Sequence, residues 1–325
     1  MADMTAGVTA VVTGITGQDG HYLADQLLRE AVDVHGVVRA GTKPTDVRGE
    51  VTIHDARLTD AESVAAVVDA VEPDFVFHLA GMSSVAASWE NPVHATEVNA
   101  LSTAALLDAC LRTQDRTGKS IVFVNASSCE IFAGSPDSPQ TEATPIRPIS
   151  PYGASKALGH SLCQVYRARS LEASNAVLYN HESPRRPTRY VTRKITTAVA
   201  DITAGRQDRL VLGDLNVRRD WGWAPDYVDA MYRMAVHGKG DDFVVATGVA
   251  HSIADFVAAA FAVAGISDWQ ELVSTDETFI RPAERAAMVG DATKAWESLG
   301  WKPTKSFSEI VVAMVESDLQ RERNT

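Results

Sequence analysis

Short apolar runs alternate with amphipathic stretches along the first half of the chain. Each apolar run is about five residues long, the usual length of a buried strand, and the stretches between them have helical spacing. The predicted strands are Val8–Thr13, Val34–Val38, Phe75–Leu79, Ile121–Asn125 and Asn175–Tyr179, and the predicted helices are Tyr22–Glu30, Ala61–Val71, Val98–Leu111 and Tyr152–Arg169. This alternation predicts an α/β fold, with a doubly wound parallel sheet and helices on both faces.

The pattern changes beyond about Asn180. The segment His181–Lys194 is rich in proline and arginine, which is typical of a functional loop. A helix is predicted at Val191–Thr203, while Asp226–Val236 and Phe243–Thr247 are expected to return to the sheet. The remainder, including Ile253–Ala264 and Phe307–Leu319, is expected to build a smaller lobe. We therefore expect a first domain over residues 1–180, joined by later segments near 215–247. A smaller α/β lobe over residues 181–325 would close over the carboxyl ends of the strands.

Composition narrows the classes of partner. The 325 residues are 45% hydrophobic, enough for a full core, and the net charge of −12 argues against nucleic-acid or anionic-membrane partners. The three cysteines form no C-x-x-C pair, which favours reduced thiols in a cytoplasmic protein. No metal-ligand spacing stands out among the nine histidines, so no metal site is predicted. We expect neither a secretory signal nor a membrane span, because Val8–Val12 is too short an apolar run.

Three glycines follow the first predicted strand at intervals of three, at Gly14, Gly17 and Gly20. Glycine permits a tight strand-to-helix turn and lets the backbone approach a pyrophosphate at the helix N-terminus. This context predicts a Rossmann nucleotide site, whereas a plain tight turn is the structural alternative. The predicted cofactor contacts are Gly14, Thr16, Gly17, Gln18, Asp19, Gly20, Leu79 and Ala80, together with Arg39, Tyr152 and Lys156.

Arg39 lies just past the second predicted strand. A carboxylate there would select NAD through the ribose 2′-hydroxyl, whereas an arginine suits a 2′-phosphate. NADP is therefore the predicted cofactor, with NAD as the alternative if Arg39 is only a solvated surface residue.

Tyr152 and Lys156 are four residues apart on a predicted helix and so share a face. A nearby ammonium would lower the pKa of the phenol toward neutral pH. The same Y-x-x-x-K spacing recurs at Tyr190 to Lys194, but only Tyr152 follows a strand that ends in hydroxyl residues. Ser128 at that strand end would bond the same substrate oxygen as Tyr152, unless it is simply a cap. Glu130 would remove a proton next to a new ketone, unless it is a solvated loop residue.

These residues resemble the extended short-chain dehydrogenase/reductase superfamily, and several stretches specifically resemble the GDP-mannose 4,6-dehydratase family. The stretches are VTGITGQDGHYLA from Val12, NHESPRR from Asn180, VTRKIT from Val191, RDWGWAPDYVDAM from Arg219, ATGVAHSI from Ala246, RPAE at Arg281 and LGWKP at Leu299. By this resemblance Ser128, Glu130, Tyr152 and Lys156 are catalytic. It also implies substrate-binding roles for Ser84, Asn180, Glu182, Arg185, Lys194, Arg219, Arg281 and Glu284.

The chain departs from the family pattern at several places. The segment between Arg39 and Val51 is short, although in the dehydratases it helps to hold the 2′-phosphate and an oligomer interface. Arg57 stands where an aspartate usually contacts adenine. Ser84, Phe132-Ala133-Gly134 and Pro187 replace a histidine, a Tyr-Gly pair and a glycine. The compact N-terminal half also resembles the GDP-4-keto-6-deoxymannose reductases.

The predicted function is dehydration of GDP-mannose to GDP-4-keto-6-deoxymannose with internal return of the hydride. A reductase or epimerase acting on a related nucleotide sugar is the alternative, and a noncatalytic NADP-binding regulator is the alternative of another class. The Ser-Glu-Tyr-Lys set argues against the regulator, because a sensor does not need it. The expected partner is a GDP-sugar, and the expected assembly is a homodimer or homotetramer.

Overall fold

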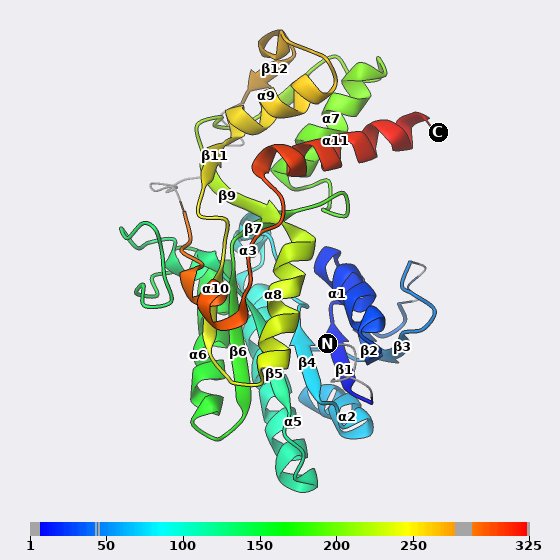
Figure 1. The fold of residues 1–325 in the computed structure, drawn as a ribbon, viewed down its shortest axis with the longest axis vertical. Helices are drawn as coiled ribbons and strands as arrows, with labels where there is room; N and C mark the ends of the chain where they lie inside the picture. Colours follow the sequence, from blue (N-terminus) through cyan, green and yellow to red (C-terminus); the bar gives the residue numbers. More distant parts are fainter. Residues whose placement is uncertain (1–6, 43, 45, 277–287, 324–325) are drawn as a thin grey trace.

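The computed structural model describes residues 7–42, 44, 46–276 and 288–323. Its centre is a seven-stranded sheet in the order β10-β6-β5-β4-β1-β2-β3, and all neighbouring strands are parallel (Figure 1). The strands are β1 (Thr9–Thr13), β2 (Asp33–Val38), β3 (Thr52–Asp55), β4 (Phe75–His78), β5 (Val122–Ser128), β6 (Glu172–Leu178) and β10 (Asp242–Val245). The predicted parallel α/β sheet is confirmed.

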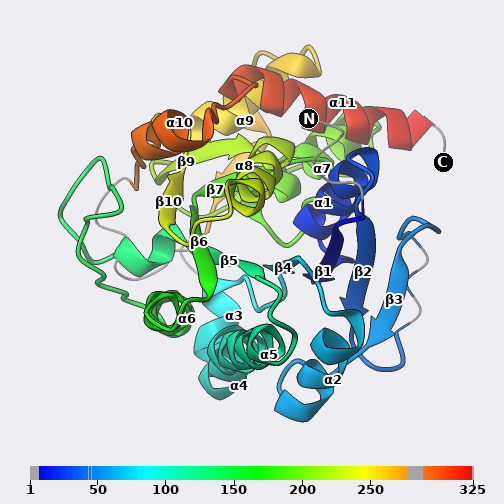
Figure 2. The ribbon, with the colours of Figure 1, turned by 60° about the horizontal axis from the view of Figure 1, so that its bottom comes forward.

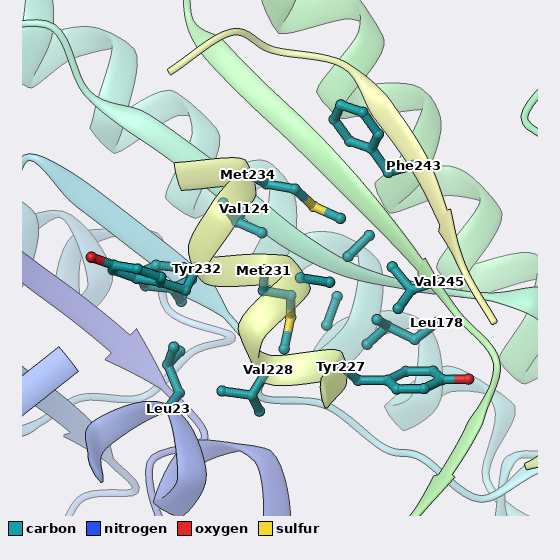
Figure 3. Close-up of a cluster of buried hydrophobic side chains, with 14 of the residues drawn as sticks. Leu23, Val124, Leu178, Tyr227, Val228, Met231, Tyr232, Met234, Phe243 and Val245 are labelled. Atoms are coloured by element: carbon teal, nitrogen blue, oxygen red, sulfur yellow. The ribbon is translucent and has the colours of Figure 1, made fainter. Parts of the chain in front are cut away.

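Helices cover both faces of this sheet, and each face has its own apolar core (Figure 2). On one face α1 (Gln18–Arg29) packs against α8 (Ala224–His237). On the other face lie α2 (Ala61–Val71), α5 (Ser102–Thr117) and α6 (Pro151–Arg167). Figure 3 shows the first core, where Met231 of α8 faces Leu178 and Val245 of the sheet and Val228 lies near Leu23 of α1.

The late segment that was expected to return to the sheet does so as a helix and a strand. Helix α8 packs on β5 and β6, and β10 pairs with β6 in parallel register from Asp242↔Asn175 to Val245↔Leu178. The predicted helix at Val98–Leu111 begins differently, because Glu97–Leu101 forms a π-helix that leads into α5. Strand β3 was not predicted, since Thr52–Asp55 is largely polar and lies at the exposed edge of the sheet.

The second lobe packs around Trp221 and Phe256, which are both fully buried. Its helices are α7 (Val191–Thr203), α9 (Ile253–Val263) and α11 (Phe307–Arg323). Two small sheets complete it, β11-β9-β7 from Ala250–Ser252, Arg218–Trp223 and Asn180–Glu182, and β12-β8 from Val273–Thr275 and Leu210–Leu212. Helix α10 (Thr293–Leu299) lies beside β10 and α8.

The lobe lies beyond the carboxyl ends of the central strands, at the top of Figure 1. In open α/β sheets these ends carry the ligand site. In the part of the chain that the structure describes, no helix is both long enough and apolar enough to cross a membrane.

Candidate active site

The turn between β1 and α1 and the first turn of α1 each contain a glycine that has no room for a side chain. Gly14 has a φ of +74°, and a Cβ added there would lie 2.8 Å from the backbone nitrogen of Ala80. A Cβ at Gly20 would lie 2.2 Å from the carbonyl oxygen of Gly14. Thr16 and Gly17 are exposed at the start of α1, and the N–H of Gly17 closes the turn by donating to the carbonyl of Gly14 at 2.9 Å. This geometry fits a nucleotide pyrophosphate at the helix N-terminus.

The side chains of Gln18 and Asp19 turn away from this surface and join α1 to β7. Gln18 donates to the carbonyl of His181 (3.2 Å) and accepts from the Ser183 hydroxyl (2.8 Å), while Asp19 lies 2.9 Å from His181 Nε2. Burial alone would lower the pKa of His181, but the carboxylate of Asp19 raises it overall, and the imidazolium in turn helps to hold the pKa of Asp19 low. The pairing therefore favours the charged form of both groups.

His181 was not predicted as a site residue, although it lies inside the NHESPRR stretch. Its ring stacks on Tyr227 with centroids 4.7 Å apart, and its Nδ1 lies 2.7 Å from the carbonyl oxygen of Tyr179. The only sequence signal for it was its place in that signature.

Arg39 and Arg57 follow two neighbouring parallel strands. Val38 of β2 is paired with Asp55 of β3, and both arginines are exposed just past those strand ends. Arg57 therefore adds positive charge to the same end of the sheet as Arg39.

Ser128 and Tyr152 meet at the end of β5. The Ser128 hydroxyl accepts from the backbone N–H of Glu130 at 3.2 Å and is hydrogen-bonded to the Tyr152 side chain. Ser150 caps α6, and the backbone N–H of Tyr152 donates to Ser88 at 3.1 Å, which fixes the start of this helix. Burial raises the pKa of Tyr152, the bond from Ser128 opposes this rise, and the charge of Glu130 adds to it.

Lys156 lies one helical turn beyond Tyr152 and is 8% exposed. Its ammonium donates to the carbonyl of Ala126 at 2.8 Å. Burial lowers its pKa to about 8, and the negative charge of Asp19 opposes this shift. A Cβ added to Gly81 would lie 3.7 Å from Nζ, so the glycine keeps backbone close to the ammonium.

Glu130 and Arg219 approach the site from different lobes. Glu130 belongs to the short 3-10 helix Cys129–Phe132, and Arg219 belongs to β9. The charges of both residues affect the pKa of the Cys129 thiol. Burial and the charge of Glu130 raise this pKa, and the charge of Arg219 lowers it. The fold thus brings a carboxylate and a guanidinium to the end of β5.

Three other residues predicted to bind substrate lie on three different elements of the structure. Ser84 caps α3 (Val85–Glu90) by accepting from the backbone N–H of Ala87, Asn180 lies in β7, and Lys194 lies in the first turn of α7. Arg281 and Glu284 lie outside the described residues.

Glu182 and Arg185 have protein partners in the structure. Glu182 is 1% exposed, accepts from Thr192 at 2.5 Å and forms an ion pair with Arg186 at 3.2 Å. Arg185 lies over the Tyr22 ring of α1, 5.9 Å from its centroid. Glu182 is therefore a buried partner of the arginine-rich segment His181–Lys194, and Arg185 lies beside α1.

The model of the family described as GDP-mannose 4,6 dehydratase matches residues 11–314. This chain belongs to the GDP-mannose 4,6-dehydratase family. It is 42% identical to GDP-mannose 4,6 dehydratase 2 of Arabidopsis thaliana, with 96% of this chain and 87% of the relative covered. It is 36% identical to the human GDP-mannose 4,6 dehydratase, covering 96% and 91%. The resemblance seen in the sequence is thereby confirmed.

Two solved structures of other proteins have a fold similar to that of this chain. The structure of RMD from Pseudomonas aeruginosa complexed with NADPH superposes with a TM-score of 0.80 at 25% identity, covering 97% of this chain and 99% of that one. The UDP-glucose 4-epimerase of Thermus thermophilus in complex with NAD gives 0.82 at 26% identity, covering 96% and 99%. The fold is thus shared by proteins solved with either dinucleotide.

Proposed function

We propose that this protein converts GDP-mannose to GDP-4-keto-6-deoxymannose by an internal oxidation, elimination and reduction. The observation that carries the proposal is the position of Glu130, which follows the end of β5 and donates its backbone N–H to the Ser128 hydroxyl at 3.2 Å, beside the Ser128–Tyr152 pair. Oxidation of an alcohol does not need this carboxylate, whereas removal of a proton next to a ketone does. Relatives named for this activity match nearly the whole chain.

The cofactor of this proposal is NADP. The close backbone approach at Gly14 suits a dinucleotide, and Arg39 and Arg57 put two positive charges just past the ends of β2 and β3, where an arginine after the second strand suits a 2′-phosphate. When bound, the nicotinamide accepts a hydride from the sugar and returns it, so no external reductant is consumed. The predicted contacts at Gly14, Thr16, Gly17, Gly20, Leu79 and Ala80 belong to this cradle. Residues 1–180, with α8 and β10, form the proposed cofactor domain.

In the proposed reaction Tyr152 takes the proton of the C4 hydroxyl as the C4 hydride leaves. Ser128 bonds the same oxygen, and the Lys156 ammonium favours the phenolate. The resulting ketone makes the C5 proton acidic. Glu130 removes that proton and passes it to the C6 hydroxyl, which departs as water and leaves a C5–C6 double bond. The hydride then returns to C6 as Tyr152 gives the proton it took from the C4 hydroxyl to C5.

The GDP end of the substrate is proposed to bind on the second lobe. Arg219, Lys194 and Asn180 are described on three of its elements, and Arg281 and Glu284 keep their predicted roles there. Arg185 would reach a phosphate from the side of α1. Arginine suits this task because its planar fork donates two hydrogen bonds to one phosphate.

A homodimer or homotetramer is proposed on the basis of an apolar surface. Elements α3, α4 (Pro92–Thr96), the π-helix and α6 pack on one another and carry half-exposed or exposed apolar side chains. These side chains are Trp89, Val93, Leu101, Leu158 and Val165. A second copy of the chain would cover them. The three cysteines are buried thiols, which suits a cytoplasmic protein.

One experiment tests this function directly. The purified protein, loaded with NADP, is incubated with GDP-mannose without any reductant. The molecular mass of the product is then measured by mass spectrometry. Loss of one water from the sugar supports a dehydratase. If GDP-mannose is left intact while NADPH is consumed with the 4-keto sugar, the protein is a reductase and the proposal fails.

A further inference from the structure

Tyr190 and Ser83 join the two lobes through their hydroxyl groups. The Oη of Tyr190 lies 2.6 Å from the Oγ of Ser83, although the two residues are 107 positions apart in the sequence. Tyr190 is the N-cap residue of α7 in the second lobe, whereas Ser83 belongs to the loop between β4 and α3 in the first. In the sequence, Tyr190 stands out only as part of a second Y-x-x-x-K pattern.

On the first lobe, the loop of Ser83 is tied to the catalytic helix. The amide of Asn99 holds this loop from both sides, because it accepts from the N–H of Met82 at 2.8 Å and donates to its carbonyl at 3.1 Å. Helix α3 starts directly after the loop, and its Ser88 accepts from the backbone N–H of Tyr152 at 3.1 Å. A displacement of Ser83 is therefore transmitted to Tyr152 through short, hydrogen-bonded connections.

On the second lobe, the ring of Tyr190 is held by arginines. The guanidinium of Arg186 lies 3.8 Å from the ring centroid, and that of Arg189 lies 5.0 Å away. Arg186 is in turn paired with the buried carboxylate of Glu182 in β7, at 3.2 Å. Cation–π contacts of this kind fix the ring plane without using the phenol hydroxyl. The hydroxyl is thus left to bridge to Ser83.

We propose that the Tyr190–Ser83 hydrogen bond is a latch that sets how the second lobe closes over Tyr152, which makes Tyr190 a positioning residue for the hexose of the GDP-sugar. This inference rests on the proposed function. The shared bond uses only one of the two hydroxyl protons, so the pair keeps one donor and several lone pairs for a sugar hydroxyl near the reacting carbon.

The first test is a double-mutant cycle with Tyr190→Phe and Ser83→Ala. The phenylalanine keeps the ring that stacks on Arg186 and loses only the hydroxyl. Each single variant should raise KM for GDP-mannose about three- to tenfold, the range expected for one hydrogen bond, with a smaller change in kcat and an unchanged Kd for NADP. The double variant should be no worse than the more strongly impaired single variant. Tyr166→Phe, in the last turn of α6 and packed against the second core, is the matched control and should behave as wild type.

A second readout needs no substrate. Trypsin can cut the arginine-rich segment His181–Lys194 after Arg185 and after Arg189. Loss of the Tyr190–Ser83 hydrogen bond should make these peptide bonds more accessible. Both single variants should be cleaved faster than wild type in this segment, with the double variant no faster than either. Unchanged cleavage, or KM effects that multiply in the double variant, would overturn the latch. If wild type fails to dehydrate GDP-mannose while the cleavage pattern holds, the proposed function falls and the latch between the lobes stands.

Discussion

The ammonium of Lys156 is buried on α6, with the carbonyl of Ala126 as its acceptor. Burial lowers its pKa to about 8, although Asp19 pulls in the opposite direction. An unfolded lysine keeps its proton up to about pH 10.4. The folded protein therefore carries an unfavourable buried charge below pH 8. Between pH 8 and about 10.4 the folded state releases the proton while the unfolded state retains it, so stability rises with pH in this window.

Lys156→Met should accordingly be inactive yet no less stable than wild type at pH 7. The pKa shift corresponds to a penalty on the order of 3 kcal/mol, which the neutral side chain avoids. The stability of the variant relative to wild type should be greatest below pH 8 and should decline toward pH 10. Melting temperatures across this range measure it. A difference that does not depend on pH would show that the lysine is not a buried charge.

Substitutions of Glu130 and Tyr152 should block different steps of the proposed reaction. Glu130→Gln should block elimination but allow some reduction of the cofactor by GDP-mannose, because the base acts after oxidation. Tyr152→Phe should block both steps. General acid–base groups typically contribute ~10²–10⁴-fold to rate. Absorbance of the reduced cofactor and the mass of the sugar report the two steps, with Glu297→Gln on the exposed side of α10 as the control. Near-normal dehydration by Glu130→Gln would assign the base to another group.

Arg39 should read the 2′-phosphate of the cofactor. Arg39→Ala should weaken NADP more than NAD, and Arg57→Ala should do the same, because both residues follow paired strands at one end of the sheet. Binding titrations with both dinucleotides give the two ratios. An equal loss of affinity for NADP and NAD in Arg39→Ala would remove this residue from the 2′-phosphate site.

At the scale of the element, one buried carboxylate, Asp242, stands at the start of β10 where this strand pairs with β6. Asp242 accepts from Gln164 at 2.8 Å and from Asn175 at 2.7 Å, and it is paired with Arg167. Burial alone would raise its pKa, but hydrogen bonds from His160 and Gln164 and the charge of Arg167 hold the pKa well below its usual range. This stabilisation is present above the unfolded pKa of about 3.9 and is lost as pH falls through the lower folded value.

Asp242→Asn should therefore lower the melting temperature at pH 7, because breaking a buried pair costs about 3–5 kcal/mol. The gap from wild type should narrow as pH falls below about 4. Asp241→Asn is the matched control, since Asp241 makes a half-exposed ion pair with Lys294 at 2.7 Å and should change stability by less than about 1 kcal/mol. Equal effects of the two substitutions would contradict the role of Asp242.

Elements with strong periodicity could be predicted from the sequence, and elements made by tertiary pairing could not. Helices α2 and α7 have the predicted bounds, because their apolar spacing is regular, and Asp60 caps the start of α2. The three-residue strands β7 and β11 exist only through their pairing with β9. The same limit applies to the site. Ser128 and Tyr152 carried local signals, whereas the link from Asp19 to His181 spans 162 positions and has no local pattern.

For the whole molecule, a net charge of −12 opposes the approach of an anionic GDP-sugar. Short-range pairing must overcome this repulsion, and Arg219 is proposed to supply part of it. The sequence alone leaves open a structural role in which Arg219 pairs with a neighbouring acid. In the structure, Asp220 accepts from Thr247 and from the backbone of Gly248 at 2.9 Å, and Asp226 accepts from Thr304 at 2.6 and 2.8 Å. These carboxylates are therefore satisfied by other donors.

Arg219→Ala should weaken GDP and GDP-mannose alike, by roughly ten- to a hundredfold for one charge-assisted contact, while NADP affinity stays nearly unchanged. Its melting temperature should also stay close to that of wild type, since Arg219 lies near the exposed end of β9 and the local carboxylates keep their partners. Calorimetry with GDP, which contains no reacting sugar, separates nucleotide binding from any effect on Glu130. A structural role would instead lower stability and the affinities for both ligands together. Unchanged GDP affinity would place the diphosphate elsewhere on the second lobe.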